Sequence, residues 1–257
     1  MRDLLRNELR VFCTAVMFFT CIPVPDGIDH GREWLQQAPR YFPLVGIIMG
    51  ALVAGVWKIG SLIWPNEIAI LLSMIAGILL TGAFHEDGFA DLCDGFGGGW
   101  TKAQVLRIMT DSRVGAFGAM GIALMLGLKA ACLMRIPESS MIAVLIAGHA
   151  LSRWLAATIL TTHVYVREES DAKAKPMATK LSGGSLAVAT AFGLLPLFFM
   201  PFVFLWSLIP LGFTRWWVGR WFQRRIGGYT GDCLGAAQQI FEVVFYLSVL
   251  ALYWNSH

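Results

Sequence analysis

The stretch "IAILLSMIAGILLTGAFHEDGFADLCDGFGGGW", residues 68–100, joins two opposite kinds of sequence. Residues 68–83 carry no charge, whereas the next 17 residues carry four acids, Glu86, Asp87, Asp91 and Asp94. A membrane-spanning helix needs roughly 20 apolar residues. The first half therefore predicts a membrane helix, and the second half raises the question of why carboxylates gather where that helix ends.

The whole chain has the composition of a membrane protein. Of its 257 residues, 56% are hydrophobic and 14% are charged, whereas soluble domains have about 25% charged residues. Long apolar runs predict an all-α, polytopic transmembrane bundle, and a β-barrel would instead show short alternating segments. We expect one integral-membrane domain, residues 1–257, with no room for a large soluble domain. The five cysteines have no CxxC spacing, so neither a zinc site nor a disulfide framework is indicated.

Charge distribution decides the number of membrane crossings. Apolar runs predict spans at 41–64, 66–84, 115–134, 139–161 and 234–254, and the run 186–212 contains three prolines. Segments 1–40, 85–114, 162–185 and 213–233 hold 16 of the 20 Lys and Arg residues, and the positive-inside rule places all four in the cytoplasm. Residues 186–222 should then form a helical hairpin, giving seven spans with the C-terminus outside; six spans is the alternative.

The N-terminal region, residues 1–40, is expected to be interfacial. Three arginines precede "VFCTAVMFFTCI", and no small-x-small cleavage site follows. Residues 3–22 are therefore interpreted as an uncleaved amphipathic helix that lies on the membrane or re-enters it.

The acids of the opening stretch form a pattern. Asp87, Asp91 and Asp94 are spaced i, i+4, i+7, which places them on one helix face, where like charges repel. A divalent cation removes that repulsion, and carboxylates without His or Cys favour Mg²⁺ or Mn²⁺. Neighbouring glycines would allow a phosphate to approach the backbone. This pattern predicts phosphoryl chemistry in 85–114, against the plainer reading of a solvated, inert acidic loop; His85 is read as an interfacial histidine.

Further polar residues lie near or inside the spans. Before the span at 115, Asp111 is a candidate metal ligand, and Ser112 and Arg113 are candidates for phosphate binding; ordinary helix-end charges are the alternative. Lys129 and Arg153 fall inside apolar runs, where charges usually face the bundle interior. Arg153 would suit a phosphate or carboxylate, Lys129 a partner within the bundle, and His149 a place in the interior.

The loop 213–233 combines arginines with a glycine-rich turn, in the stretch "RWFQRRIGGYTGDCLGAAQQ" that begins at residue 220 and continues to residue 239. Basic residues before a helix N-terminus make a phosphate cradle, and Arg224 is the candidate residue. Thr230 and Asp232 are candidates for contact with nucleotide or metal. Asp232 has the alternative role of capping the helix that begins near Leu234.

Several motifs resemble one known family, the cobalamin synthases, or adenosylcobinamide-GDP ribazoletransferases. "FHEDGFADLCDGFGGG" and "GYTGDCLGA" are the most specific, and "FFTCIPVP", "YFPLVGIIMG" and "RIMTDSRVGAFG" agree in order, so the resemblance covers nearly the whole chain. One position departs: the family usually has an Arg before Pro-x-Pro, where this chain has Cys21 and Ile22.

The resemblance implies a function that composition cannot. It implies transfer of cobinamide phosphate from adenosylcobinamide-GDP to a hydroxyl of α-ribazole or α-ribazole 5′-phosphate, with release of GMP, by a Mg²⁺-dependent enzyme of the bacterial inner membrane. Asp87, Asp91 and Asp94 would hold the metal, Glu86 would be a further ligand or a base, and Arg113 and Arg224 would hold phosphates. The lipid bilayer is an expected partner and nucleic acid is not; a homo-oligomer or association with other enzymes of the pathway stays open.

Two other functions compete with this one. A CDP-alcohol phosphotransferase uses a similar Asp-Gly-x-x-Ala motif, but continues with a long spacer and two more Asp, whereas Asp94 follows Asp91 after two residues here. A cation-coupled transporter would place its carboxylates near the bilayer midplane on broken helices, and here they lie at a boundary beside glycines and basic loops.

Overall fold

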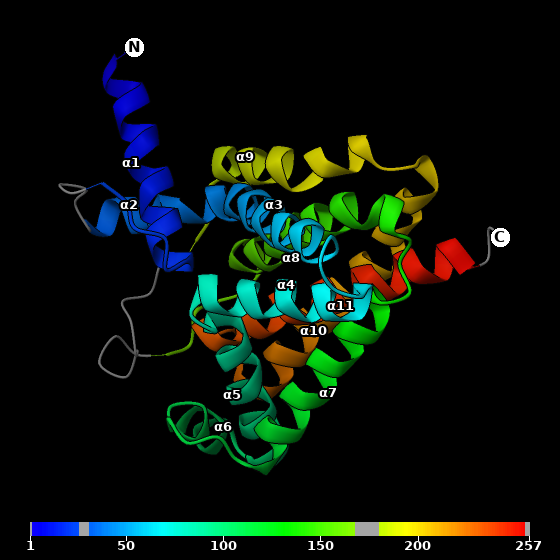
Figure 1. The fold of residues 1–257 in the computed structure, drawn as a ribbon. Coiled ribbons are helices and arrows are strands. Elements are labelled where there is room, and N and C mark those ends of the chain that lie inside the picture. The colour runs from blue at the N-terminus through cyan, green and yellow to red at the C-terminus, as the bar shows by residue number, and fades with distance from the viewer. Residues whose placement is uncertain (1, 26–30, 168–179, 255–257) are drawn as a thin grey trace.

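The computed structural model describes residues 2–25, 31–167 and 180–254, and within these ranges every named element is a helix (Figure 1). The predicted all-α bundle is confirmed. The elements are α1 (Arg2–Phe19), α2 (Arg32–Gln37), η1 (Ala38–Tyr41), α3 (Phe42–Gly60), α4 (Asn66–Thr81), α5 (Phe84–Gly98), α6 (Lys102–Ile108), α7 (Ala116–Leu133), α8 (Glu138–Thr162), α9 (Gly183–Leu194), η2 (Leu195–Phe199), η3 (Phe202–Ser207), α10 (Leu208–Ile226) and α11 (Gly231–Trp254).

Five described helical segments are long and apolar enough to cross a membrane: 33–60, α7, α8, 202–226 and α11. The bent pair α4 and α5 makes a sixth. The predicted hairpin is present, because α9 and η2 form one apolar arm, Met200 and Pro201 break the helix, and η3 with α10 forms the next (Figure 1). The first arm, Gly183–Phe199, is shorter than a full span, so the seventh predicted crossing depends on this short segment.

Helices α8 and α11 form the centre of the bundle. In each of these helices, 72% of the most apolar 18-residue stretch is buried inside the protein. The corresponding share is 33% for α7 and 28% for the segment that contains α10. Helix α3 packs closely on α8 through Gly46 and Gly50. A Cβ at Gly50 would lie 2.6 Å from the Cα of Ile146, and one at Gly46 would collide with the carbonyl of His149. Small residues four apart allow this backbone approach between membrane helices.

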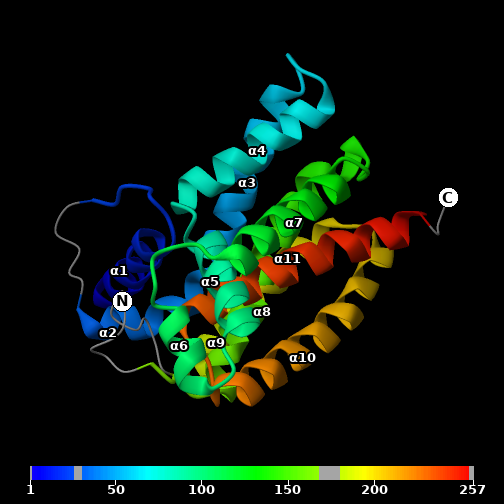
Figure 2. The same ribbon diagram turned by 90° about the horizontal axis from the view of Figure 1, so that it is seen from below.

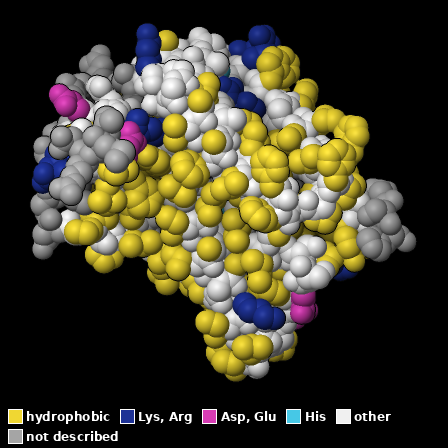
Figure 3. Space-filling model, turned by 90° about the horizontal axis from the view of Figure 1, so that it is seen from above, with side chains coloured by type: hydrophobic (Ala, Val, Ile, Leu, Met, Phe, Trp, Pro, Cys, Tyr) yellow, Lys and Arg dark blue, Asp and Glu magenta, His cyan; other side chains and the backbone are white. Residues whose placement is uncertain are grey.

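The outer surface of the bundle is apolar. Figure 3 shows hydrophobic side chains across the visible face, with most of the charged side chains near its margins. Large exposed side chains occur on several helices, including Leu124 on α7, Phe198 in η2 and Phe213 on α10. Water-facing surfaces rarely carry contiguous apolar patches of this extent, so the described surface fits contact with lipid.

The N-terminal helix α1 is amphipathic, as predicted, but it ends at Phe19 rather than near residue 22. Leu5 and Leu9 are exposed on it, and Glu8 pairs with Arg40 at 2.9 Å. After the helix, the backbone N–H of Cys21 donates to the carbonyl of Leu80 at 2.7 Å. This bond ties the chain to the end of α4, the point where the acidic helix begins.

Candidate active site

A sharp break between α4 and α5 positions the acidic helix. Gly82 and Ala83 both adopt left-handed backbone conformations, with φ of 62° and 57°, and the two helix axes differ by 88°. Glycine adopts this conformation without steric cost, whereas an L-residue such as Ala pays roughly 1–2 kcal/mol. The predicted span 66–84 therefore ends at Thr81, and α5 leaves α4 steeply toward α6 (Figure 1 and Figure 2).

The three aspartates of α5 differ in surroundings. Asp87 is exposed and Asp91 is 8% exposed. Asp94 accepts hydrogen bonds from the backbone N–H groups of Gly115 at 2.7 Å and Gly118 at 2.8 Å. These are first-turn groups of α7 that have no partner within their own helix, so Asp94 caps α7 from a neighbouring helix.

This contact bears on the predicted three-aspartate metal site. Within the described residues, no three His, Cys, Asp or Glu side chains gather closely enough to hold a metal ion. Both carboxylate oxygens of Asp94 are engaged by α7. Asp87 and Asp91 remain one helical turn apart on α5, and Mg²⁺ commonly uses one or two carboxylates together with substrate phosphates. The chemistry of this donor pair fits that ion.

The second specific motif meets the first at the beginning of α11. The side-chain oxygen of buried Thr230 accepts from the N–H of Cys233 at 3.3 Å, so Thr230 caps α11. Our alternative role for Asp232 as the cap was wrong; Asp232 instead pairs with Arg167 at 2.8 Å. A Cβ at Gly88 would lie 2.9 Å from the carbonyl oxygen of Asp232, so the first turn of α11 rests directly on α5 beside Asp87.

Two segments far apart in the sequence form a clamp around this junction. The N–H of Tyr229 donates to the carbonyl of Val164 at 2.9 Å, and the N–H of Val166 donates back to Tyr229 at 3.0 Å. Tyr229 is 1% exposed, and this burial raises the pKa of its hydroxyl. The clamp holds Arg167 next to Asp232.

The loops around α5 carry the other predicted residues. Arg113 pairs with Asp111 through two side-chain contacts, at 3.0 and 2.7 Å, and both are solvent-accessible beside Ser112. Arg224 is exposed near the end of α10. Its neighbour Arg225 donates to the carbonyls of Phe96 and Gly99 at 2.6 and 2.8 Å, and thereby anchors the C-terminal end of α5.

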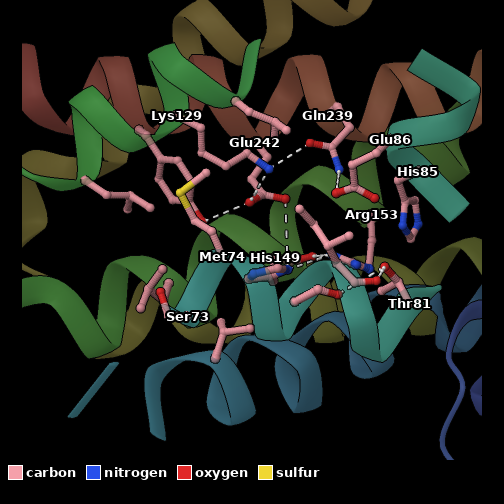
Figure 4. Close-up of a pocket in the computed structure, with 17 residues that line it drawn as sticks. Ser73, Met74, Thr81, His85, Glu86, Lys129, His149, Arg153, Gln239 and Glu242 are labelled. Atoms are coloured by element: carbon pink, nitrogen blue, oxygen red, sulfur yellow. Dashed lines mark hydrogen bonds and ion pairs between the residues drawn. The ribbon is translucent and has the colours of Figure 1, made fainter. Parts of the chain in front are cut away.

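A second face of α5, which carries Glu86, points into the bundle toward a buried polar network (Figure 4). Glu86 accepts from the side chain of Gln239 at 2.8 Å, and Gln239 accepts from Lys129 at 2.7 Å. Lys129 also pairs with Glu242 at 3.1 Å. Lys129 therefore has the partner within the bundle that its position in an apolar run predicted.

Arg153 and two histidines complete the network. Arg153 donates to the ring Nδ1 and the backbone carbonyl of His149, at 3.0 and 3.1 Å, and lies 5.7 Å from the ring centre of Phe42. His85 is 1% exposed and stacks on Phe42 with centroids 5.8 Å apart. His149 is an interior residue as predicted, and His85 is buried rather than interfacial.

A cavity lies among these side chains. Its lining includes Glu86, Lys129, His149, Arg153 and Glu242 (Figure 4). The space open to the centres of water molecules is about 30 Å³, and one water needs roughly 10–15 Å³ on that scale. The cavity therefore holds about two waters and is too small, as it stands, for a nucleotide.

Comparison with known proteins agrees with the two motifs. The family described as CobS, cobalamin-5-phosphate synthase, matches residues 11–251. The chain belongs to the cobalamin-5-phosphate synthase family. It is 47% identical over 250 residues to an adenosylcobinamide-GDP ribazoletransferase of Shewanella frigidimarina, covering 96% of each chain. It is 45% identical over 256 residues to the protein of that name from Ralstonia pickettii, and the match covers 98% of each chain. It is 40% identical over 253 residues to the one from Vibrio cholerae, and the match covers 98% of this chain and 97% of the relative. No solved structure gives a significant match.

The resemblance proposed from the motifs is thus confirmed, and membership of the cobalamin-5-phosphate synthase family goes against both competing functions. Sequence reasoning missed Arg167, Gln238, Gln239 and Glu242, and among the neighbouring arginines it chose Arg224 rather than Arg225 as the site residue. A signal existed for Glu242, because it is the only acid after residue 232 and falls within an apolar run, where ionisable residues usually have a function. Nothing in the sequence separated Arg225 from its neighbour Arg224.

Proposed function

We propose that this protein transfers the cobinamide phosphate of adenosylcobinamide-GDP to a hydroxyl of α-ribazole or α-ribazole 5′-phosphate and releases GMP. The observation that carries the proposal is the contact between the two most specific motifs. They meet where Gly88 touches Asp232, two residues that are 144 positions apart in sequence. Relatives that carry the enzyme's name align with 96% and 98% of this chain.

The transfer is a displacement at phosphorus. The acceptor hydroxyl forms a new oxygen–phosphorus bond with the cobinamide phosphate, the bond from that phosphorus to the bridging oxygen breaks, and GMP leaves with the bridging oxygen. The hydroxyl proton passes to a base. Such transfers need positioning of the reactants and neutralisation of charge more than covalent chemistry.

The first turn of α5 and the start of α11 suit the pyrophosphate. Asp87 and Asp91 would hold Mg²⁺, with Mn²⁺ as the alternative, and the ion would neutralise negative charge that develops on the leaving GMP. The N-terminal end of α11 carries a partial positive charge, and it lies against Gly88. Arg167 adds a positive charge beside Asp232. The backbone and these side chains orient the pyrophosphate next to the acidic face.

Other predicted residues take more peripheral roles in this arrangement. Arg113, Ser112 and Arg224 are accessible, and we assign them to the nucleotide phosphates. Thr230 is fully buried and supports the turn rather than touching substrate. Asp94 caps α7. Asp111 pairs with Arg113.

We further propose that the protein lies in the bacterial inner membrane with α5 and the loop before α11 on the cytoplasmic side. The concentration of Lys and Arg in four segments supports this orientation. It also places the acidic helix where nucleotide substrates are made.

The direct test is GMP release by purified protein in detergent, with Mg²⁺, adenosylcobinamide-GDP and α-ribazole 5′-phosphate. We expect formation of the joined corrinoid, and its loss in Asp91→Asn. Glu138→Gln is a matched control, because Glu138 is an exposed acid in the first turn of α8. Absence of GMP release from folded wild-type protein would overturn the proposed reaction, and full activity of Asp91→Asn would overturn the assigned face.

A further inference from the structure

Among the described residues, six buried side-chain nitrogen or oxygen atoms have no hydrogen-bond partner, and three of them belong to residues that line the interior cavity. These three are Nε2 of His85, Oε2 of Glu86 and Nε of Arg153. All three residues line the same cavity, and Figure 4 shows them at one end of it. Leaving a buried polar group without a partner costs about 1–3 kcal/mol. Three such groups around one cavity indicate a place where a ligand or water supplies the missing bonds.

A closed ring of hydrogen bonds holds Glu86 in place. The amide of Gln239 donates one hydrogen to Glu86 at 2.8 Å and the other to Gln238 at 3.0 Å, while its oxygen accepts from Lys129 at 2.7 Å. Gln238 donates to Glu242 at 2.6 Å, and Glu242 closes the ring with Lys129 at 3.1 Å. Every hydrogen-bonding atom of the Gln239 amide is used, so its orientation, and with it that of Glu86, is fixed.

The charges around the cavity balance. Lys129 and Arg153 are opposed by Glu86 and Glu242, and all four line the cavity. The Nδ1 atom of His149 accepts a hydrogen bond from Arg153, because a guanidinium has only donors. This nitrogen therefore carries no proton, and the ring is neutral. A balanced site gives little preference for a phosphate or a divalent cation, since either would leave buried charge uncompensated.

Two of these three unpartnered atoms instead match a hydroxyl group. Oε2 of Glu86 needs a donor and Nε of Arg153 needs an acceptor. A hydroxyl supplies both from one atom, and its size suits a cavity with room for about two waters. The neighbouring residue, Asp87, belongs to the proposed pyrophosphate face, so a hydroxyl bound here lies beside the reacting centre.

We propose that this cavity is a subsite for ribosyl hydroxyls of the nucleoside acceptor, and that Gln239 is the positioning residue that orients Glu86 toward them. The inference rests on the proposed function, because that function supplies the nucleoside. The amide groups of a corrinoid offer a similar combination of donor and acceptor, and the experiment must separate these two sources.

The test uses the full-length protein and equilibrium binding of α-ribazole and of its 2′- and 3′-deoxyribosyl analogues. Wild-type protein should bind α-ribazole about 10- to 100-fold more tightly than at least one deoxy analogue, as expected for a hydrogen bond to a charged group. Gln239→Met should lose most of this discrimination, raise the KM for the acceptor, and keep the KM for adenosylcobinamide-GDP within about twofold.

Thr190→Val is the matched control for loss of a bundle hydrogen bond. Thr190 accepts from the indole of Trp154 at 3.0 Å, and neither residue lines the cavity. This variant should keep wild-type discrimination. A folded Gln239→Met protein that still discriminates, or that weakens binding of adenosylcobinamide-GDP instead, overturns the inference. Wild-type protein that neither binds α-ribazole nor releases GMP overturns the proposed function itself.

Discussion

Replacing Asp94 separates its role as a helix cap from the predicted role as a metal ligand. The carboxylate accepts from two backbone N–H groups of α7, at 2.7 and 2.8 Å. Asn at this position keeps one acceptor oxygen and turns its amide toward the other N–H, so one bond is lost. Loss of a capping bond costs about 0.5–2 kcal/mol, and we expect Asp94→Asn to cost about 1–2 kcal/mol on that basis.

Melting in detergent measures this cost. For a chain of this size, each kcal/mol lowers the Tm by about 2–4 °C, so Asp94→Asn should melt roughly 2–8 °C lower, and Asp94→Ala lower still. GMP release below the melting range should persist in Asp94→Asn. Asp91→Asn, the same chemical change three residues away, should lose turnover.

The opposite pattern would refute the reasoning. An Asp94→Asn protein that melts with the wild type, yet loses turnover as completely as Asp91→Asn, would show that Asp94 serves the metal and that its contact with α7 contributes little.

Three further predictions concern stability. Lys129→Met leaves Glu242 buried without its cation and should cost about 3–5 kcal/mol; adding Glu242→Leu should restore part of the Tm, and no recovery would contradict the pairing. Arg225→Gln should lower the Tm by breaking its two bonds to α5 carbonyls, each worth about 1.5–3 kcal/mol, while the exposed neighbour change Arg224→Gln should not; equal shifts would contradict the anchor. Burial, and then the charge of Arg215, lower the pKa of His163 below 6.5, so the unfolded chain binds more protons and stability should fall as pH drops below about 6.5. His163→Gln should weaken this pH dependence in melting curves, and an unchanged slope would contradict it.

The membrane helices could be predicted because a helix surrounded by lipid needs a continuous run of apolar residues, which the local sequence shows directly. Apolar runs predict the helices. The basic loops predicted a hairpin between residues 185 and 213, and the break at Met200 and Pro201 divides this run into two helical arms. The break after α4 was not predicted. Gly82 suits a left-handed turn, but Ala83 does not favour one, and its conformation depends on packing around the turn.

The sequence predicted which residues belong to the candidate site, but only part of how they lie relative to one another. The helical face of Asp87 and Asp91 follows from spacing within one element. Asp94, by contrast, accepts hydrogen bonds from Gly115 and Gly118 at the start of another helix. Glu242, the partner of Lys129, lies more than 100 residues away in the sequence. Such pairings depend on how helices pack, and one sequence does not record which of several charged residues will meet.

The break between α4 and α5 explains why four acids follow an uncharged run. Turning α5 by 88° takes its first turn out of line with α4, so its side chains need not share one environment. Consecutive helical residues point about 100° apart, so Glu86 faces the buried cavity while Asp87 is exposed. An acceptor hydroxyl held on the first face and a pyrophosphate held on the second would meet at this single turn. A straight helix through the membrane would have placed the same carboxylates in line with the lipid-facing residues of α4, where neither reactant could be held.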